Sequence, residues 1–306
     1  MIALCVLSGL GIKPLQASTA PSTENSSLVC TNSTCENSGN RITNPQNAFK
    51  FAASANDGVG AGIINKRNEK DTNSTFIANN NKLKIDNPIN KYQNYASAYI
   101  RISEINSPDL LKTTYKANEN NLKITNSTLS NGKSTADDKG VTYGAYIWTQ
   151  LHIDIHSPNS EIREAFAISN ENKVDISNST LFGNTYGALA YTSLAFYDSL
   201  HNASNPNSEP EPNFTLHSAF ASAEANKNAV SLSANEEKEV TGNIFGAKSW
   251  VYIPPTVKSD ITSASLIANE NSISIDTYNL NCSVGVRMNA PESATPYLSA
   301  HVGTCR

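Results

Sequence analysis

Charge of either sign is scarce in this chain. Charged residues make up 16% of the 306 residues, and the formal net charge is −4 with a pI near 5.8. This balance offers no basic patch for nucleic acid or for an anionic membrane. The apolar run Ala3–Ile12 is too short to cross a bilayer as a helix. We therefore expect neither nucleic acid as a partner nor a membrane-spanning helix in that run.

The usual sequence motifs of catalytic sites are also missing. No G-x-S-x-G or G-D-S-G segment marks a serine nucleophile, and no glycine-rich loop is arranged to hold phosphate. β-Helix enzymes that act on polysaccharides use clustered Asp, Lys and Arg side chains. The one compact acidic-basic group, Asp137–Lys139, lies beside Gly140 and is more typical of a solvated turn. We predict no enzymatic activity and no cofactor.

Cysteine is rare, and four cysteines follow the first apolar run. An even number of cysteines in an exported chain favours disulfides, most simply Cys30 with Cys35 and Cys282 with Cys305. A metal site is the alternative. No His lies at ligand spacing from the first pair, and His301 is a lone candidate near the second.

His152, Asp154 and His156 form the most compact cluster of metal-ligand residue types. On a strand they share one face, and each step of two residues advances about 6.5–7 Å. Neighbouring pairs could bracket a metal ion, but His152 and His156 lie too far apart to share one. An exposed polar face is the favoured interpretation, and we predict no metal site.

The first 47 residues are expected to lie outside the folded domain. Residues 1–17 resemble a signal peptide that ends in the imperfect cleavage site Leu15–Ala17, although no basic residue precedes the apolar run. Residues 18–47 are rich in Ser, Thr and Asn, and so contain too little apolar surface to offset the entropy of ordering. We predict a polar leader there and a repeat domain over residues 48–306.

One sequence unit recurs five times in that domain. An Asn precedes an alternating apolar pair, then come a polar turn and a strand of small residues opened by an aromatic, as in NENKVDISNSTLFGNTYGALAY, Asn170–Tyr191. The apolar anchors are Leu83, Leu122, Val174, Val230 and Ile273, at intervals of 39, 52, 56 and 43 residues. A constant core with length differences confined to polar segments is typical of stacked repeats.

Alternation with a period of two dominates each unit, while helical periodicity is scarce. A long apolar strand (143–156 or 185–199) runs into a polar loop, and a return strand such as Glu164–Ser169 then leads to the Asn-led strand. We therefore predict an all-β protein, a parallel β-helix or β-solenoid of about five repeats with loop or hairpin insertions. The five anchors should lie in register in one parallel sheet.

Two residue types recur at fixed places in the unit. Asn at equivalent positions can either hydrogen-bond to its copy on the next coil or simply turn the chain, and the sequence leaves both open. Gly behind the aromatic suits a corner where backbones approach closely. The residues concerned are Asn120, Asn172, Asn228 and Asn271, and Gly144, Gly187 and Gly246.

The N-x-V-x-I strand, short turn and Y-G-A or F-G-A strand resemble the repeats of bacterial autotransporter passenger regions over residues 49–288. The resemblance is strongest in the units at Asn120, Asn172 and Asn228. It implies a β-solenoid that is exported through an outer-membrane barrel and acts as an adhesin. The chain departs from the family in using Gly-Ala for Gly-Gly. No barrel-like series of strands precedes Cys305–Arg306 either, so an export barrel is expected outside this sequence.

We expect a secreted protein, or one displayed at the bacterial cell surface, with a structural or adhesive role. Its partner would be a protein or glycan of a host or neighbouring cell, contacted by the loops 132–140 and 199–213 and by nearby aromatics. Two alternatives remain, a polysaccharide-degrading β-helix enzyme and an outer-membrane barrel built from antiparallel hairpins. The aromatic candidates are Tyr146, Trp148, Tyr197, Trp250 and Tyr252, and packing in the core is the competing role for such rings.

Overall fold

All the regular structure that can be described is β-strand. A computed structural model describes residues 26–30, 34–45, 59–65, 73–86, 94–95, 98–104, 111–129, 143–155, 162–181, 183–196, 215–235, 237–238, 240–241, 244–252, 258–277, 280–281 and 284–289. Within these ranges the chain forms no helix, and hence none that could cross a membrane.

The strands are arranged in four sheets. The seven-stranded sheet contains, in spatial order, β1 (Ser26–Cys30), β4 (Val59–Asn65), β8 (Ala98–Glu104), β12 (Tyr143–Ile155), β16 (Asn184–Phe196), β20 (Ile244–Tyr252) and β24 (Val284–Asn289). The Ala-rich sheet contains β2 (Thr34–Glu36), β5 (Ser74–Ile77), β9 (Lys112–Lys116), β13 (Ile162–Ile168), β17 (Thr215–Glu224) and β21 (Lys258–Ile267). The Asn-led sheet contains β3 (Arg41–Thr43), β6 (Lys82–Asp86), β10 (Asn121–Thr125), β14 (Lys173–Ser177), β18 (Ala229–Ala234) and β22 (Ser272–Thr277). A narrow sheet contains β7 (Asn94–Tyr95), β11 (Thr128–Leu129), β15 (Thr180–Leu181), β19 (Val240–Thr241) and β23 (Leu280–Asn281).

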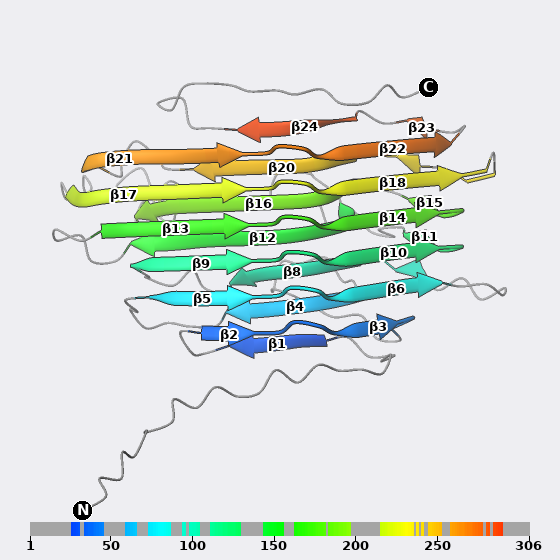
Figure 1. The fold of residues 1–306 in the computed structure, drawn as a ribbon, viewed down its shortest axis with the longest axis horizontal. Helices are drawn as coiled ribbons and strands as arrows, with labels where there is room; N and C mark the ends of the chain where they lie inside the picture. The colour runs from blue at the N-terminus through cyan, green and yellow to red at the C-terminus, as the bar shows by residue number, and fades with distance from the viewer. Residues whose placement is uncertain are drawn as a thin grey trace, which may run out of the picture.

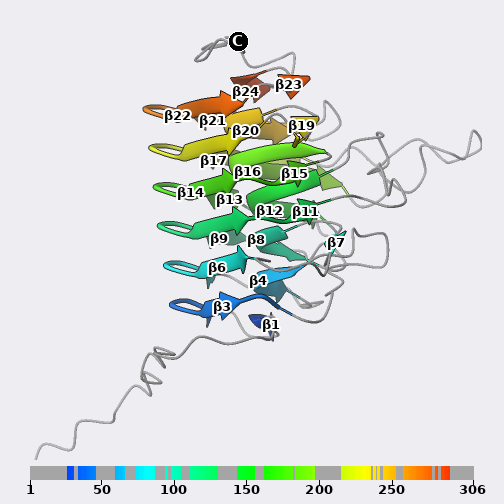
Figure 2. The ribbon, with the colours of Figure 1, turned by 90° about the vertical axis from the view of Figure 1, so that its right-hand side faces the viewer.

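The chain visits the sheets in rotation, and each full circuit is called a coil here. Successive coils lie one above another, with the Ala-rich and Asn-led sheets side by side and the seven-stranded sheet behind them (Figures 1 and 2). Every strand pair formed by the described residues is parallel, including the long strands β12 and β16, which do not form an antiparallel hairpin. The arrangement is consistent with the predicted parallel β-helix.

The five anchor residues lie in one sheet and in one register, as predicted. Leu83 pairs with Leu122, Leu122 with Val174, Val174 with Val230, and Val230 with Ile273. The first four anchors are at most 1% exposed, because alternate residues of each Asn-led strand face the core.

The first coil begins earlier than the sequence indicated. Strands β1, β2 and β3 lie within residues 18–47, where composition predicted a polar leader, and they pair in parallel with β4, β5 and β6. Ile42 is 2% exposed and continues the anchor column below Leu83. Residues 26–30 and 34–45 thus belong to the stack, because a single coil needs little apolar surface of its own when a neighbouring coil covers it.

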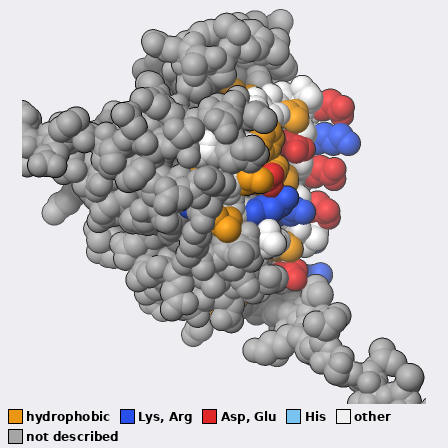
Figure 3. Space-filling view, turned by 90° about the vertical axis from the view of Figure 1, so that its left-hand side faces the viewer, with side chains coloured by type: hydrophobic (Ala, Val, Ile, Leu, Met, Phe, Trp, Pro, Cys, Tyr) orange, Lys and Arg blue, Asp and Glu red, His pale blue; other side chains and the backbone are white. Residues whose placement is uncertain are grey.

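A three-residue turn of sequence Asn-x-Asn links the Ala-rich and Asn-led sheets in each of the later coils. Its middle residue has a left-handed backbone, with φ of 56–57° at Asn80, Glu119, Glu171, Lys227 and Glu270. Four of these middle residues carry charge, and charged side chains project in a column along one edge of the molecule (Figure 3). The projecting column is a consequence of the turn, because left-handed backbone at the middle position directs the chain outward.

The second Asn of each turn forms a buried ladder. The backbone N–H and the side-chain amide of Asn120 both donate to Oδ1 of Asn172, at 3.0 and 3.1 Å. Asn172 donates in the same way to Asn228, at 2.9 and 3.1 Å, and Asn228 donates to Asn271. Asn81 and Asn40 extend the ladder downward. The structure therefore supports the ladder role for these residues, and the same residues also sit in the turn.

The first Asn of each turn forms a second ladder of opposite polarity. Here the backbone N–H of the upper coil donates to Oδ1 of the lower coil, as from Asn118 to Asn79 at 2.8 Å and from Asn170 to Asn118 at 2.9 Å. The same bond joins Asn226 to Asn170 and Asn269 to Asn226. With both ladders in place, backbone N–H groups flanking the middle residue find acceptors where strand pairing is interrupted.

Close approach of backbones explains one of the recurring Gly-Ala pairs of the repeat. A Cβ on Gly187 would overlap the carbonyl oxygen of Gly246 and would lie 3.0 Å from Val230 Cγ2. A Cβ on Gly144 would instead meet the side chain of Leu181 at 3.2 Å. The crowded corner predicted from sequence is therefore tightest at Gly187, where the neighbour is fixed backbone.

We expect the substitution Asn172→Ala to lower the free energy of unfolding by about 2–4 kcal/mol, because two buried donors of Asn120 lose their acceptor. Urea denaturation followed by circular dichroism measures the change. The control Glu171→Ala changes the exposed middle residue of the same turn and should cost less than about 0.5 kcal/mol. Equal losses in the two variants would contradict a stabilising ladder.

The substitution Gly187→Ala should lower stability by about 1–3 kcal/mol, because the added methyl group meets backbone that cannot yield. Gly144→Ala is the matched control, since the end of the Leu181 side chain can move aside. Thermal denaturation of both variants is the measurement, and the melting temperature of Gly187→Ala should be clearly the lower.

Candidate functional site

Aromatic side chains form a column on the outer face of the seven-stranded sheet. Tyr99, Tyr146, Tyr186 and Phe245 occupy paired positions on successive strands. The rings of Tyr99 and Tyr146 stack at 5.6 Å between centroids, and those of Tyr186 and Phe245 stack at 4.9 Å. The three tyrosines are only 1–2% exposed and form a cluster separate from the main core. The column therefore packs one coil on the next outside the central core.

A second set of rings beside this column is half-buried and carries cations. The guanidinium of Arg101 lies 4.5 Å from the centroid of the Trp148 ring, and its Nη2 donates to Oε1 of Gln150 at 2.8 Å. Two coils higher, Lys248 Nζ lies 4.9 Å from the centroid of Trp250. Contacts of this kind contribute about 0.5–2 kcal/mol each. We call Arg101, Trp148, Gln150, Tyr191, Lys248 and Trp250 the cation-aromatic face.

The cation-aromatic face combines groups that suit recognition of a polar partner. The rings of Tyr191 and Trp250 meet edge to face at 5.0 Å on adjacent strands. Their apolar faces can pack on a sugar ring or a peptide, while the cations and the amide of Gln150 can bond to its polar groups. The face offers positioning and contact and contains no nucleophile paired with a base.

The structure separates the five aromatic residues that the sequence proposed for binding. Tyr146 is 1% exposed, so its ring packs and does not present a binding surface, and this corrects the prediction for that residue. Trp148 and Trp250 lie half-buried on the cation-aromatic face. Tyr252 ends β20, but its side chain is not described, and Tyr197 lies outside the described residues. The two loops predicted for binding also lie outside them.

Sequence reasoning missed Arg101 and Lys248. Both lie two residues from an aromatic on the same strand, Arg101 after Tyr99 and Lys248 before Trp250. Spacing of two places residues on one face of a strand, so the alternation carried a usable signal. The partner ring of Arg101 could not be found in this way, because Trp148 belongs to the next coil.

Of the histidine and acidic candidates, only His152 has a side chain that the structure describes. His152 is half-buried on the outer face of β12, the side chain of Asp154 is not described, and His156 and Asp137–Lys139 lie outside the described residues. No group of three or more His, Cys, Asp or Glu side chains within the described ranges could hold a metal ion.

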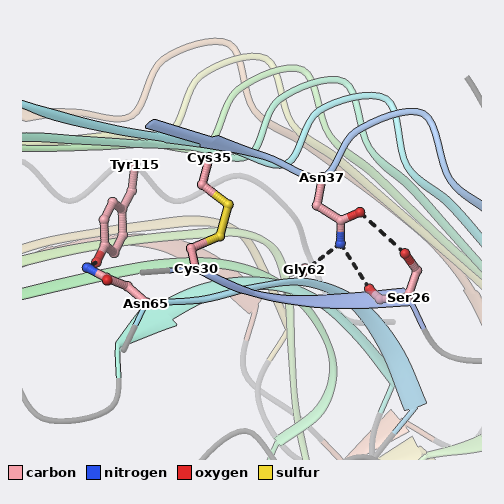
Figure 4. Close-up of a disulfide and its surroundings, with 7 residues drawn as sticks. All are labelled: Ser26, Cys30, Cys35, Asn37, Gly62, Asn65 and Tyr115. Atoms are coloured by element: carbon pink, nitrogen blue, oxygen red, sulfur yellow. Dashed lines mark hydrogen bonds between the residues drawn. A yellow bond between two sulfur atoms is a disulfide. The ribbon is translucent and has the colours of Figure 1, made fainter. Parts of the chain in front are cut away.

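A disulfide joins Cys30 at the end of β1 to Cys35 in β2, so it links the seven-stranded and Ala-rich sheets within the first coil (Figure 4). The Cα atoms are 6.2 Å apart. Nearby, the side-chain amide of Asn65 donates to the hydroxyl of Tyr115 at 3.0 Å in the buried interior. Cys282 and Cys305, the other predicted pair, lie outside the described residues.

Comparison of this chain with profiles of known protein families, with curated proteins and with solved structures found no match in any of the three.

We expect the double substitution Cys30→Ala/Cys35→Ala to lower stability by about 2 kcal/mol, because the disulfide restricts the unfolded chain and joins two short strands of 5 and 3 residues. Thermal denaturation with and without dithiothreitol is the test. The reductant should lower the melting temperature of the parent protein and leave the double variant unchanged. A parent protein insensitive to reductant would contradict a stabilising role.

Proposed function

We propose that this chain is a parallel β-solenoid, displayed on a bacterial cell surface like an autotransporter passenger, with an adhesive role. Its partner would be a protein or glycan on a host or neighbouring cell. The proposal rests on the resemblance of the repeat to autotransporter passenger repeats and on the way in which the coils stack. It assigns recognition of the partner to the outer surface of the stack.

The observation that carries the proposal is the constancy of the scaffold despite unequal coil lengths. The buried Asn ladder uses the same bonds across sequence separations of 39, 52, 56 and 43 residues. Extra residues therefore leave the strands and the turn unchanged. Segments that vary in length on a rigid scaffold are where binding proteins usually carry recognition.

The outer face of the seven-stranded sheet supports the same role. Its half-buried rings and cations lie on β8, β12, β16 and β20, and each of these strands is followed in the chain by one of the variable segments. A partner held by those segments would also meet the cation-aromatic face. Large aromatic side chains are frequent among the residues that dominate binding energy.

Adhesion of cells that display the protein provides the test. The variant Tyr191→Ala/Trp250→Ala should weaken attachment to host or neighbouring cells at least tenfold, because two contact rings are lost. The control Phe166→Ala/Phe220→Ala removes two rings that belong to the Ala-rich sheet and whose centroids are 5.3 Å apart. This control should leave attachment unchanged. Circular dichroism confirms that both variants fold.

A deletion variant tests the variable segment directly. Removing residues 204–213 should leave the circular dichroism spectrum and the melting temperature nearly unchanged while attachment falls, because this polar, proline-containing segment adds little core. If attachment is unaffected and the purified protein depolymerises a glycan, the enzyme alternative replaces the adhesive role.

A further inference from the structure

Five cations gather on the outer face of the Asn-led sheet. Arg41, Lys82, Lys84, Lys123 and Lys173 are all exposed and come from β3, β6, β10 and β14, the Asn-led strands of four successive coils. These strands lie one above another (Figure 1). We call the five residues the cationic strip. Composition alone suggested no basic patch, and the structure corrects this, because it brings together residues far apart in the chain.

The register of the sheet places like charges directly beside one another. Arg41 pairs with Lys82, and Lys84 pairs with Lys123, so in each case two cations stand on adjacent strands about 4.8 Å apart. Like charges at directly paired positions destabilise a sheet. The strip therefore costs the fold some stability.

Neighbouring carboxylates neutralise only part of the strip. Lys84 pairs with Asp86 at 3.3 Å, and Lys173 pairs with Asp175 at 3.1 Å. Arg41, Lys82 and Lys123 form no ion pair within the part of the chain that the structure describes. Asp175 occupies the position paired with Lys123 on the next strand, but its ion pair is with Lys173. Three cations without an ion pair thus remain on a sheet face of a protein whose net charge is −4.

Positive charge is not a requirement of these strand positions. In the next two coils the equivalent outward positions hold Ala229 and Ser231, and then Ser272 and Ser274. These coils keep the same pairing and the same ladders without a cation at these strand positions. Positive charge at these strand positions is therefore confined to the first four coils, and the fold does not require it.

We propose that the cationic strip binds a linear acidic polysaccharide that lies across the strands, along the direction in which the coils stack. Four strands span about 14 Å at a spacing of about 4.8 Å, so a short length of polymer can meet all five cations. Lysine ammonium groups bind carboxylate and sulfate groups as point charges, without a fixed geometry. The inference does not depend on the adhesive role, since it concerns another sheet face.

Polar neutral side chains between the cations favour a polysaccharide over a nucleic acid. Thr43, Asn121 and Thr125 lie among the cations on the same outer face and can hydrogen-bond to sugar hydroxyl groups. None of the described outward positions of β3, β6, β10 and β14 holds an aromatic residue. Binding of single-stranded nucleic acid normally uses aromatic rings on which bases stack.

Binding of the full chain to heparin and to polygalacturonate tests the proposal, with dextran as the uncharged polymer and single-stranded DNA as the competing polyanion. Biolayer interferometry should detect both acidic polysaccharides at about 50 mM salt, with much weaker binding at about 300 mM because exposed charges are screened. Dextran should not bind. The proposal would be overturned if neither heparin nor polygalacturonate bound. It would also be overturned if single-stranded DNA bound as tightly as heparin.

Variants locate the site. Lys82→Ala/Lys84→Ala/Lys123→Ala should weaken heparin binding about 100-fold, at about fivefold for each lysine near an anionic surface. The control Lys112→Ala/Lys116→Ala/Lys227→Ala removes equal charge from elsewhere and should bind within about threefold of the parent. Lys82→Gln/Lys123→Gln removes two charges with less loss of side-chain volume and should weaken binding about 25-fold. If the Lys82→Gln/Lys123→Gln variant bound heparin as tightly as the parent protein, the proposal would be overturned.

Discussion

Hydrogen bonds between Asn side chains and the backbone of the next coil are the interaction on which the rest of this structure depends. Strand pairing would otherwise be interrupted at every turn between the Ala-rich and Asn-led sheets. The two ladders supply the missing acceptors from opposite directions, one to the coil above and one to the coil below. The turn is therefore as firmly bonded as the strands, and it sets the spacing of the coils at one strand separation.

Because the spacing between coils is fixed, differences in coil length are confined to certain segments of the chain. Coils of different length make the same ladder bonds, so additional residues are accommodated away from the turn. Part of the high Asn content of the sequence is explained by these ladder bonds, because each coil supplies Asn residues to them. A scaffold of this kind separates stability from recognition, because the segments between strands do not carry the core.

The outer faces of the sheets differ, although one repeat generates them all. The seven-stranded sheet places rings and cations in contact, and its tyrosines pack coil on coil. The Asn-led sheet instead carries exposed cations in its first four coils, whereas the equivalent positions above them hold Ala and Ser. Because a side chain on one coil lies about 4.8 Å from its equivalent on the next, any outward residue type that recurs becomes a stripe.

The sequence by itself determined the strands and the parallel register of the anchors, because alternation and recurrence are properties of local sequence. It identified Asn120, Asn172 and Asn228 as recurring residues, and only the structure decided that they form a ladder. The sequence did not show that β1, β2 and β3 form a coil, since their burial depends on the coil above.

Only the tertiary structure decided that Tyr146 is buried, that Arg101 lies over Trp148, and that Lys84 stands beside Lys123. Arg101 and Trp148, and likewise Lys84 and Lys123, are about 40 or more positions apart in the chain. The Asn residues joined by the ladder are similarly far apart, as Asn81 and Asn120 show. Composition gives only an average over the whole chain, whereas the sheet register brings residues that are distant in the chain within one strand spacing of each other.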